Sequence, residues 1–169
     1  MKNARQLYAF PRRVAEVAAP TYASGMPQRS LRILIRGQKI LTVPKETTVR
    51  EAARLMKKMR VGAAMVVAKE KLIGIFTERD ALFRVLAEGR DPMTTQLADV
   101  MTAKPQAISP DRPFGYALHL MYEGGFRHVP VVENGRPIGM VSARDALGPE
   151  LQQFASELER KTQIGEILG

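Results

Sequence analysis

The chain has 169 residues, of which 45% are hydrophobic, so it can bury the core of one ordinary domain or of two very small ones. It has no cysteine, which excludes disulfides, thiolate metal sites and thiol nucleophiles. Its two histidines show no recognisable metal-ligand spacing, and no apolar run approaches the roughly 18 residues of a membrane span. The N-terminus lacks the apolar run of a secretory signal, so we expect a cytoplasmic protein that is not inserted in a membrane.

Residues 1–30 are predicted to form a basic N-terminal arm rather than a domain. Residues 1–39 hold eight Lys or Arg residues against one acid, Glu16, so this part contributes +7 of the net charge of +9. Proline and glycine interrupt the arm, and no helical or strand period emerges in it.

Residues 31–89 have the pattern of one small α+β repeat. A short strand is expected at residues 40–43, and Thr48 with Glu51 has the spacing of a capping box that opens a helix. Two apolar runs at residues 63–68 and 72–76, separated by a polar turn, are typical of a buried hairpin. Thr77 is a good N-cap for a last helix that runs to about Glu88, with Gly89 as its stop.

Residues 90–148 copy this plan at an offset of 65 residues without a gap. The segment KLIGIFTERDAL at 71–82 lies on RPIGMVSARDAL at 136–147, and similarity extends upstream into the preceding helix. A strand is expected near residues 107–108, a helix after Pro113, and strands at 129–132 and 138–141. Because one unit of about sixty residues exposes too much apolar surface alone, we expect a pseudo-twofold pair packed through its sheets.

Residues 149–169 depart from the repeat. Gly148 and Pro149 end the last helix of the second repeat early. Leu151, Phe154 and Leu158 then have the spacing of a fresh amphipathic helix, which we expect to dock on the pair or on a second copy of it.

One motif occurs at equivalent places in both repeats: a glycine, three strand residues, Thr or Ser, two residues, and Asp. A hydroxyl at the helix start and a carboxylate one turn later lie beside free backbone N–H groups and the positive end of a helix dipole. This arrangement suits a phosphate, while the carboxylate can accept hydrogen bonds from both hydroxyls of a ribose. The same spacing is also that of an ordinary capping box, which stabilises a helix by roughly 1 kcal/mol and has no further role.

The doubled GIFTERDAL and GMVSARDAL, the link Asp99-Val100-Met101-Thr102 with Pro105, and the segment Arg127-His128-Val129-Pro130-Val131 resemble a pair of CBS (cystathionine-β-synthase-type) domains, or Bateman module. The resemblance covers about residues 31–148. It implies two α+β units with a cleft between their sheets, where adenosine-type ligands bind and regulate an enzyme, channel or transporter. It also implies a flat homodimer of two such pairs.

The resemblance assigns roles to individual residues by their place in these motifs. Ribose binding falls to Asp80, Asp145, Thr77 and Ser142. Phosphate binding falls to Arg127, His128, Arg79 and Arg144, because two cations on one phosphate form charge-assisted bonds. The adenine slot is expected along Val43, Ala63, Ala64, Ile108, Val129 and Pro130.

The two repeats differ in the residues expected to hold phosphate. Gly62 and Ala63 of the first repeat stand where the second has Arg127 and His128, and the second has Ala143 where the first has Glu78. This asymmetry predicts one better site and one weaker or empty site.

We therefore expect a stand-alone, non-catalytic sensor that binds AMP, ADP, ATP or NAD, needs no cofactor, and acts on an unidentified protein target. The alternative is nucleic-acid binding through the basic arm, where Tyr8, Phe10 and Tyr22 are interleaved with arginines. Catalysis has little support in the sequence, which has no nucleophile–base pair, no Walker-type phosphate loop and no cluster of metal ligands.

Overall fold

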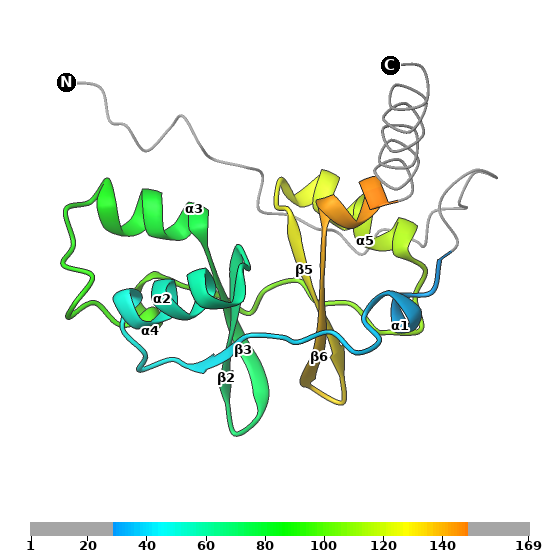
Figure 1. The fold of residues 1–169 in the computed structure, drawn as a ribbon, viewed down its shortest axis with the longest axis horizontal. Coiled ribbons are helices and arrows are strands. Elements are labelled where there is room, and N and C mark those ends of the chain that lie inside the picture. The colour runs from blue at the N-terminus through cyan, green and yellow to red at the C-terminus, as the bar shows by residue number, and fades with distance from the viewer. Residues whose placement is uncertain (1–28, 149–169) are drawn as a thin grey trace, which may run out of the picture.

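The structure is a computed structural model that describes residues 29–148. Figure 1 shows two halves side by side, one with β2, β3 and α2 and the other with β5, β6 and α5. The predicted N-terminal arm and the predicted C-terminal helix lie outside the described residues. Within residues 29–148, none of the helices has the length and hydrophobicity needed to cross a membrane.

The first half is a four-stranded sheet covered by helices. Strand β1 (Thr42–Pro44) is parallel to β2 (Ala63–Ala68), which pairs antiparallel with β3 (Lys71–Thr77), and β3 pairs with β4 (Thr102–Ala103). Helix α2 (Val49–Met59) lies between β1 and β2 in the chain and begins with the predicted capping box of Thr48 and Glu51. The helical segment after β3 starts as α3 (Glu78–Asp80) and continues as the π-helical turn η2 (Ala81–Leu86).

The second half repeats these elements at the predicted offset of 65 residues. Helix α5 (Phe114–Gly124), strands β5 (His128–Glu133) and β6 (Arg136–Ser142), and the 3₁₀ turn η3 (Ala143–Leu147) follow one another. Ile108 forms a single parallel bridge to Val131, at the place where Val43 of β1 pairs with Val66 of β2. The predicted α+β fold with two strand-helix-strand-strand-helix repeats is confirmed.

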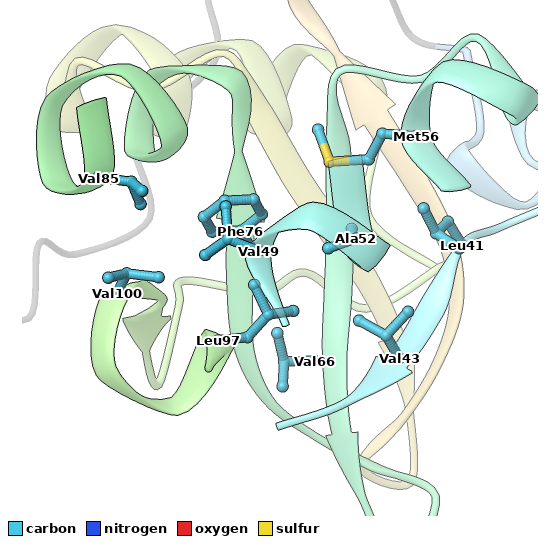
Figure 2. Close-up of a cluster of buried hydrophobic side chains, with 11 residues drawn as sticks. Leu41, Val43, Val49, Ala52, Met56, Val66, Phe76, Val85, Leu97 and Val100 are labelled. Atoms are coloured by element: carbon cyan, nitrogen blue, oxygen red, sulfur yellow. The ribbon is translucent and has the colours of Figure 1, made fainter. Parts of the chain in front are cut away.

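Each half has its own hydrophobic core, and each core is completed by a short helix that precedes the other repeat in the sequence. Figure 2 shows the first core, in which Leu97 and Val100 of α4 (Leu97–Val100) pack beside Phe76. In the second core, Leu31 of α1 (Leu31–Leu34) packs with the residues of α5, β5 and β6. The two repeats therefore exchange their leading segments, and the predicted boundary near residue 90 does not separate the two packing units.

Two glycines allow this exchange by letting a side chain lie directly on a strand. A Cβ on Gly74 of β3 would lie 2.3 Å from the Sδ of Met101, and a Cβ on Gly139 of β6 would lie 2.6 Å from the Cγ2 of Ile35. Met101 follows α4 and Ile35 follows α1, so the two contacts are equivalent. Only glycine leaves room for them without a shift of these side chains.

The two hairpins also touch at their tips. The backbone N–H of Leu72 donates to the carbonyl oxygen of Gly135 over 3.0 Å. The Arg136 guanidinium forms a salt bridge with Glu70 across the same junction. Together with contacts between β3 and β6, these bonds fix the two halves relative to each other.

Candidate functional site

The motif of the first repeat forms a closed capping box at the start of α3. The Asp80 Oδ2 accepts hydrogen bonds from the Thr77 backbone N–H (2.9 Å) and from the Thr77 hydroxyl (2.7 Å). The Thr77 hydroxyl oxygen accepts in turn from the Asp80 N–H over 3.3 Å. Strand β3 delivers Thr77 directly to the helix start, so the same geometry that caps the helix places the carboxylate at the strand end.

The second oxygen of Asp80 is held by an arginine one turn further along the helix. The Arg84 Nε lies 3.3 Å from the Asp80 Oδ1, and the Arg84 Nη1 donates to the Val100 carbonyl oxygen over 2.8 Å. Asp80 is only 8% exposed, and burying a charge costs free energy unless the charge is paired and hydrogen-bonded. Arg84 and the hydrogen bonds of the cap offset this cost.

The motif of the second repeat has the same cap in a more open setting. The Asp145 Oδ2 accepts from the Ser142 backbone N–H (2.6 Å) and from its hydroxyl (3.0 Å). Asp145 is half-buried, and Arg29 donates to its backbone carbonyl oxygen rather than to its carboxylate. The capping interpretation of the motif is therefore realised in both repeats, and the ribose-binding role of the two aspartates stays a prediction.

A cleft of about 700 Å³ lies between the two repeats at the first motif. One wall is the β3–α3 junction, with Thr77 and Asp80. The opposite wall is the connection from α5 to β5 and the start of β5, with Arg127 and His128. The volume lies within the range of roughly 300–1,000 Å³ that is usual for small-molecule sites. The predicted phosphate-binding pair of the second repeat thus lies opposite the predicted ribose-binding pair of the first.

The charged residues of this first cleft are mostly basic. Four cations line it, namely Arg79, Arg84, Lys104 and Arg127. The two carboxylates are those of Glu78 and Asp80, and the Asp80 carboxylate is already paired with Arg84. The Arg79 Nη1 reaches across to the other repeat and donates to the Gly125 carbonyl oxygen over 3.0 Å. The excess of positive charge suits an anionic ligand.

A second, smaller cleft of about 120 Å³ lies at the second motif. Ser142, Arg144 and Asp145 line it, and Gly62 occupies the place that Arg127 has in the first cleft. The Gln38 side chain crosses to β6, where it both donates to the Met140 carbonyl oxygen and accepts from the Met140 N–H, each over 2.8 Å. The second cleft therefore has less room and no equivalent of Arg127, although Lys39 and Arg60 also line it.

A comparison with protein-family models finds the CBS domain twice, at residues 35–87 and 97–148, which together make up more than half of the chain. The chain belongs to the CBS-domain family. CBS-domain proteins are generally regulatory and non-catalytic, often bind adenine nucleotides and form oligomers.

Curated relatives and solved structures share this family. The CBS domain-containing protein CBSCBSPB3 of Arabidopsis thaliana is 37% identical over 135 residues, which cover 79% of this chain and 24% of the relative. The mitochondrial CBS domain-containing protein CBSX3 of the same plant is 34% identical, covering 68% of this chain and 58% of its own length. The chain spans about a quarter or less of the length of the first curated relatives that it matches.

A solved structure of a protein with CBS domains from Burkholderia ambifaria is similar in fold and in sequence. It has a TM-score of 0.64 and 34% identity, and the match covers 69% of this chain and 85% of that one.

In this CBS pair the residues of the predicted adenine slot are mostly buried, and the slot itself stays a prediction. Val43 and Ala64 belong to the first core, while Ile108 and Val129 belong to the second, each at most 3% exposed. Pro130 is also fully buried, and Ala63 is the one member of the set that lines either of the two clefts described above. Val43 and Ala64 are thus part of the core of the first repeat, and Ile108 and Val129 part of the core of the second.

The apolar residues that line the first cleft are ones to which the sequence assigned no ligand role. They include Ile75 of β3, Pro105 after β4, and Phe126 before β5. Lys104 and Gln106 join them from the same connection as Pro105. One pattern in the sequence could have pointed to this connection. At an offset of 66 residues, Lys104 stands where Gln38 stands before the first repeat, so the connections around these two residues are expected at equivalent places in the two repeats.

His128 lies between the two clefts and lines both. Burial, followed by the positive charge of Arg127, holds the pKa of His128 below its usual value. The imidazole is therefore neutral at pH 7 unless a bound anion stabilises its protonated form. Among the described residues, no group of three or more His, Cys, Asp or Glu side chains could hold a metal ion.

Proposed function

We propose that this CBS pair is a non-catalytic regulatory module that binds one adenosine-type nucleotide, such as AMP, ADP, ATP or NAD, in the first cleft. The observation that supports this most directly is the position of Arg127 and His128 opposite Thr77 and Asp80, across a space large enough for a nucleotide. Family membership supports the class of ligand, and the residues of this cleft support its orientation.

In this proposal the phosphates lie toward the basic wall. Arg127, Arg79 and Lys104 come from three separate segments, and charge-assisted hydrogen bonds to phosphate are roughly twice as strong as neutral ones. The ribose hydroxyls donate to the Asp80 Oδ1 in competition with Arg84, while the Oδ2 keeps its cap. The base packs on the apolar side, against Ile75 and Phe126.

The second cleft is proposed to be the weaker site. Besides Lys39 and Arg60 it offers Ser142, Arg144 and Asp145, but Gly62 gives it no counterpart of Arg127, and its volume is only about 120 Å³. A nucleotide could enter only if Gln38 gave up its two hydrogen bonds to β6. We therefore expect one nucleotide per chain.

The signal passes from ligand to partner through the bond that joins the two walls. Arg79 now donates to the Gly125 carbonyl oxygen, which lies at the C-terminal end of α5. A phosphate that attracts Arg79 weakens this bond, so the ligand binds two arrangements of the repeats with different affinity, as any regulatory switch requires. The protein target and the homodimer remain part of the proposal.

Isothermal titration calorimetry with AMP, ADP, ATP and NAD tests the proposal. Arg127→Gly installs the residue that the first repeat has at the equivalent position, and removing a hydrogen bond to a charged group costs about 1.5–3 kcal/mol, or roughly 10- to 100-fold in affinity. Arg144→Ala, the matched variant in the second cleft, should leave the affinity unchanged. No heat with any nucleotide below 1 mM, or equal losses in the two variants, would contradict the proposal.

Nucleic-acid binding through the basic N-terminal arm stays a prediction from the sequence, because residues 1–28 lie outside the described part of the chain. It is separated from nucleotide binding by deletion of residues 1–30. That deletion should remove the arm's contribution to nucleic-acid affinity and leave the calorimetric signal of a nucleotide intact.

A further inference from the structure

Helix α2 has a basic face that neither the core nor the proposed nucleotide cleft explains. Arg50, Arg54, Lys57 and Lys58 are all exposed. At 3.6 residues per turn they fall within an arc of about 100°, opposite the buried side of the helix. We call these four residues the basic face of α2.

The acidic neighbours do not neutralise this face. Within residues 29–148, no carboxylate lies within salt-bridge distance of any of its four cations. The one acid of the helix, Glu51, is engaged at the N-terminus, where its carboxylate accepts from the backbone N–H and the hydroxyl of Thr48, and of the four cations it interacts electrostatically with Arg54, without a salt bridge. The nearby Asp91 accepts from the N–H of Met93 within its own loop.

The second repeat shows that the fold does not need these cations. Helix α5 occupies the same place at the offset of 65 residues, and its equivalent positions hold Gly115, His119, Tyr122 and Glu123. The two helices begin and end at equivalent residues. Since the same architecture forms without a basic face, its presence on one repeat points to a partner.

From these observations we infer that the basic face of α2 binds the phosphate backbone of a nucleic-acid duplex, independently of sequence. From Arg50 to Lys58 the helix rises about 12 Å, roughly two intervals between neighbouring phosphates of one strand, which lie about 7 Å apart, so the face can contact two or three successive phosphates. The helix has no aromatic residue on which an unpaired base could stack, so paired strands suit it better than single strands.

A membrane surface fits this face less well. Interfacial helices insert an apolar side into the lipid, and the apolar side of α2 is already buried in the first core through Val49, Ala52 and Met56. The outward side carries the four cations of the basic face, with the partly exposed Leu55 beside them, and this concentration of positive charge complements a regular polyanion. This inference does not depend on the proposed nucleotide site, because none of the four cations lines the first cleft.

Fluorescence anisotropy of the full chain with a labelled 24-base-pair DNA duplex tests the inference over a range of salt concentrations. The variant Arg54→Gln/Lys57→Gln/Lys58→Gln should weaken binding at least about 10-fold and reduce the slope of log K against log salt by about 2–3, close to one unit per cation. The matched control Lys69→Gln/Lys71→Gln/Arg90→Gln removes the same charge from other exposed positions and should change the affinity less than about twofold.

Each alternative outcome overturns the inference in a recognisable way. Equal losses in the two triple variants would show that net charge alone acts. Loss on deletion of residues 1–30, with no effect of the α2 variant, would assign binding to the arm. Binding of the basic face to anionic lipid vesicles but not to the duplex would identify a membrane surface instead.

The variant Arg54→Lys/Lys57→Arg/Lys58→Arg, which keeps the charge, should retain duplex binding.

Discussion

The exchange of leading segments between the repeats makes an unusual prediction about where a core mutation acts. Leu31 precedes the first repeat in the sequence but lies in the second core, where it is fully buried. Leu31→Ala should therefore weaken β5 and β6, which lie about 100 residues away in the chain, more than the adjacent β2 and β3. Leu97→Ala, its counterpart in the first core, should do the reverse.

The size of the effect follows from what is removed. Leu→Ala deletes three carbon groups, which at about 0.8 kcal/mol each amounts to about 2.4 kcal/mol of lost burial. The cavity left behind adds to this, so a total of about 3 kcal/mol is expected, within the range of roughly 2–5 kcal/mol for buried leucines. Since about 1.4 kcal/mol is a factor of ten, the weakened core should open roughly 100 times more often.

Native-state hydrogen exchange followed by mass spectrometry measures this opening element by element. In Leu31→Ala, peptides from β5 and β6 should exchange about 100-fold faster than in the wild type, and peptides from β2 and β3 much less. Faster exchange confined to β2 and β3 would refute the exchanged packing. Equal acceleration in both halves would refute the idea that the two cores open separately.

Three further predictions concern single residues. Burial lowers the pKa of His128, so below pH 6.5 the unfolded chain takes up a proton that the folded chain does not. Urea midpoints should therefore be lower at pH 5.5 than at pH 7.5, and less so in His128→Gln. Gly74→Ala sets a methyl group 2.3 Å from the Met101 Sδ, so thermal unfolding should show a loss of about 1–3 kcal/mol. Asp80→Asn should cost more stability in urea than Asp145→Asn, about 2 against 1 kcal/mol, because only Asp80 is buried and paired with an arginine.

Local patterns in the sequence were enough to predict the repeated framework. The capping box at Thr48, the hairpin strands and the helix start at Thr77 depend on neighbours within a few residues, and all were found where expected. The last helix of the first repeat ends a little before the predicted Glu88, at Leu86, and its final segment is π-helical. The strand expected at residues 40–43 starts two residues later and ends one residue later, at Thr42–Pro44.

The exchange of α1 and α4 could not be predicted from the same patterns. Four-residue helices are too short to show a helical period, and the two are related by an offset of 66 rather than 65 residues. The sequence also could not show whether the residues of the predicted adenine slot face the cleft, for a related reason. A buried strand residue can face either its own core or the cleft, and periodicity alone does not say which face is which. The part of the site placed by motif, from Thr77 to Asp80 and at Arg127, does meet in one cleft.

The reciprocal packing has a consequence for how the chain responds to cutting. A protease that cleaves the exposed loop at residues 90–96 would produce two fragments. Helix α1 of the N-terminal fragment would remain packed in the second core, which belongs to the C-terminal fragment. The C-terminal fragment would likewise retain α4 within the core of the first. A nicked molecule would thus stay assembled under native conditions, and its two pieces would part only on denaturation.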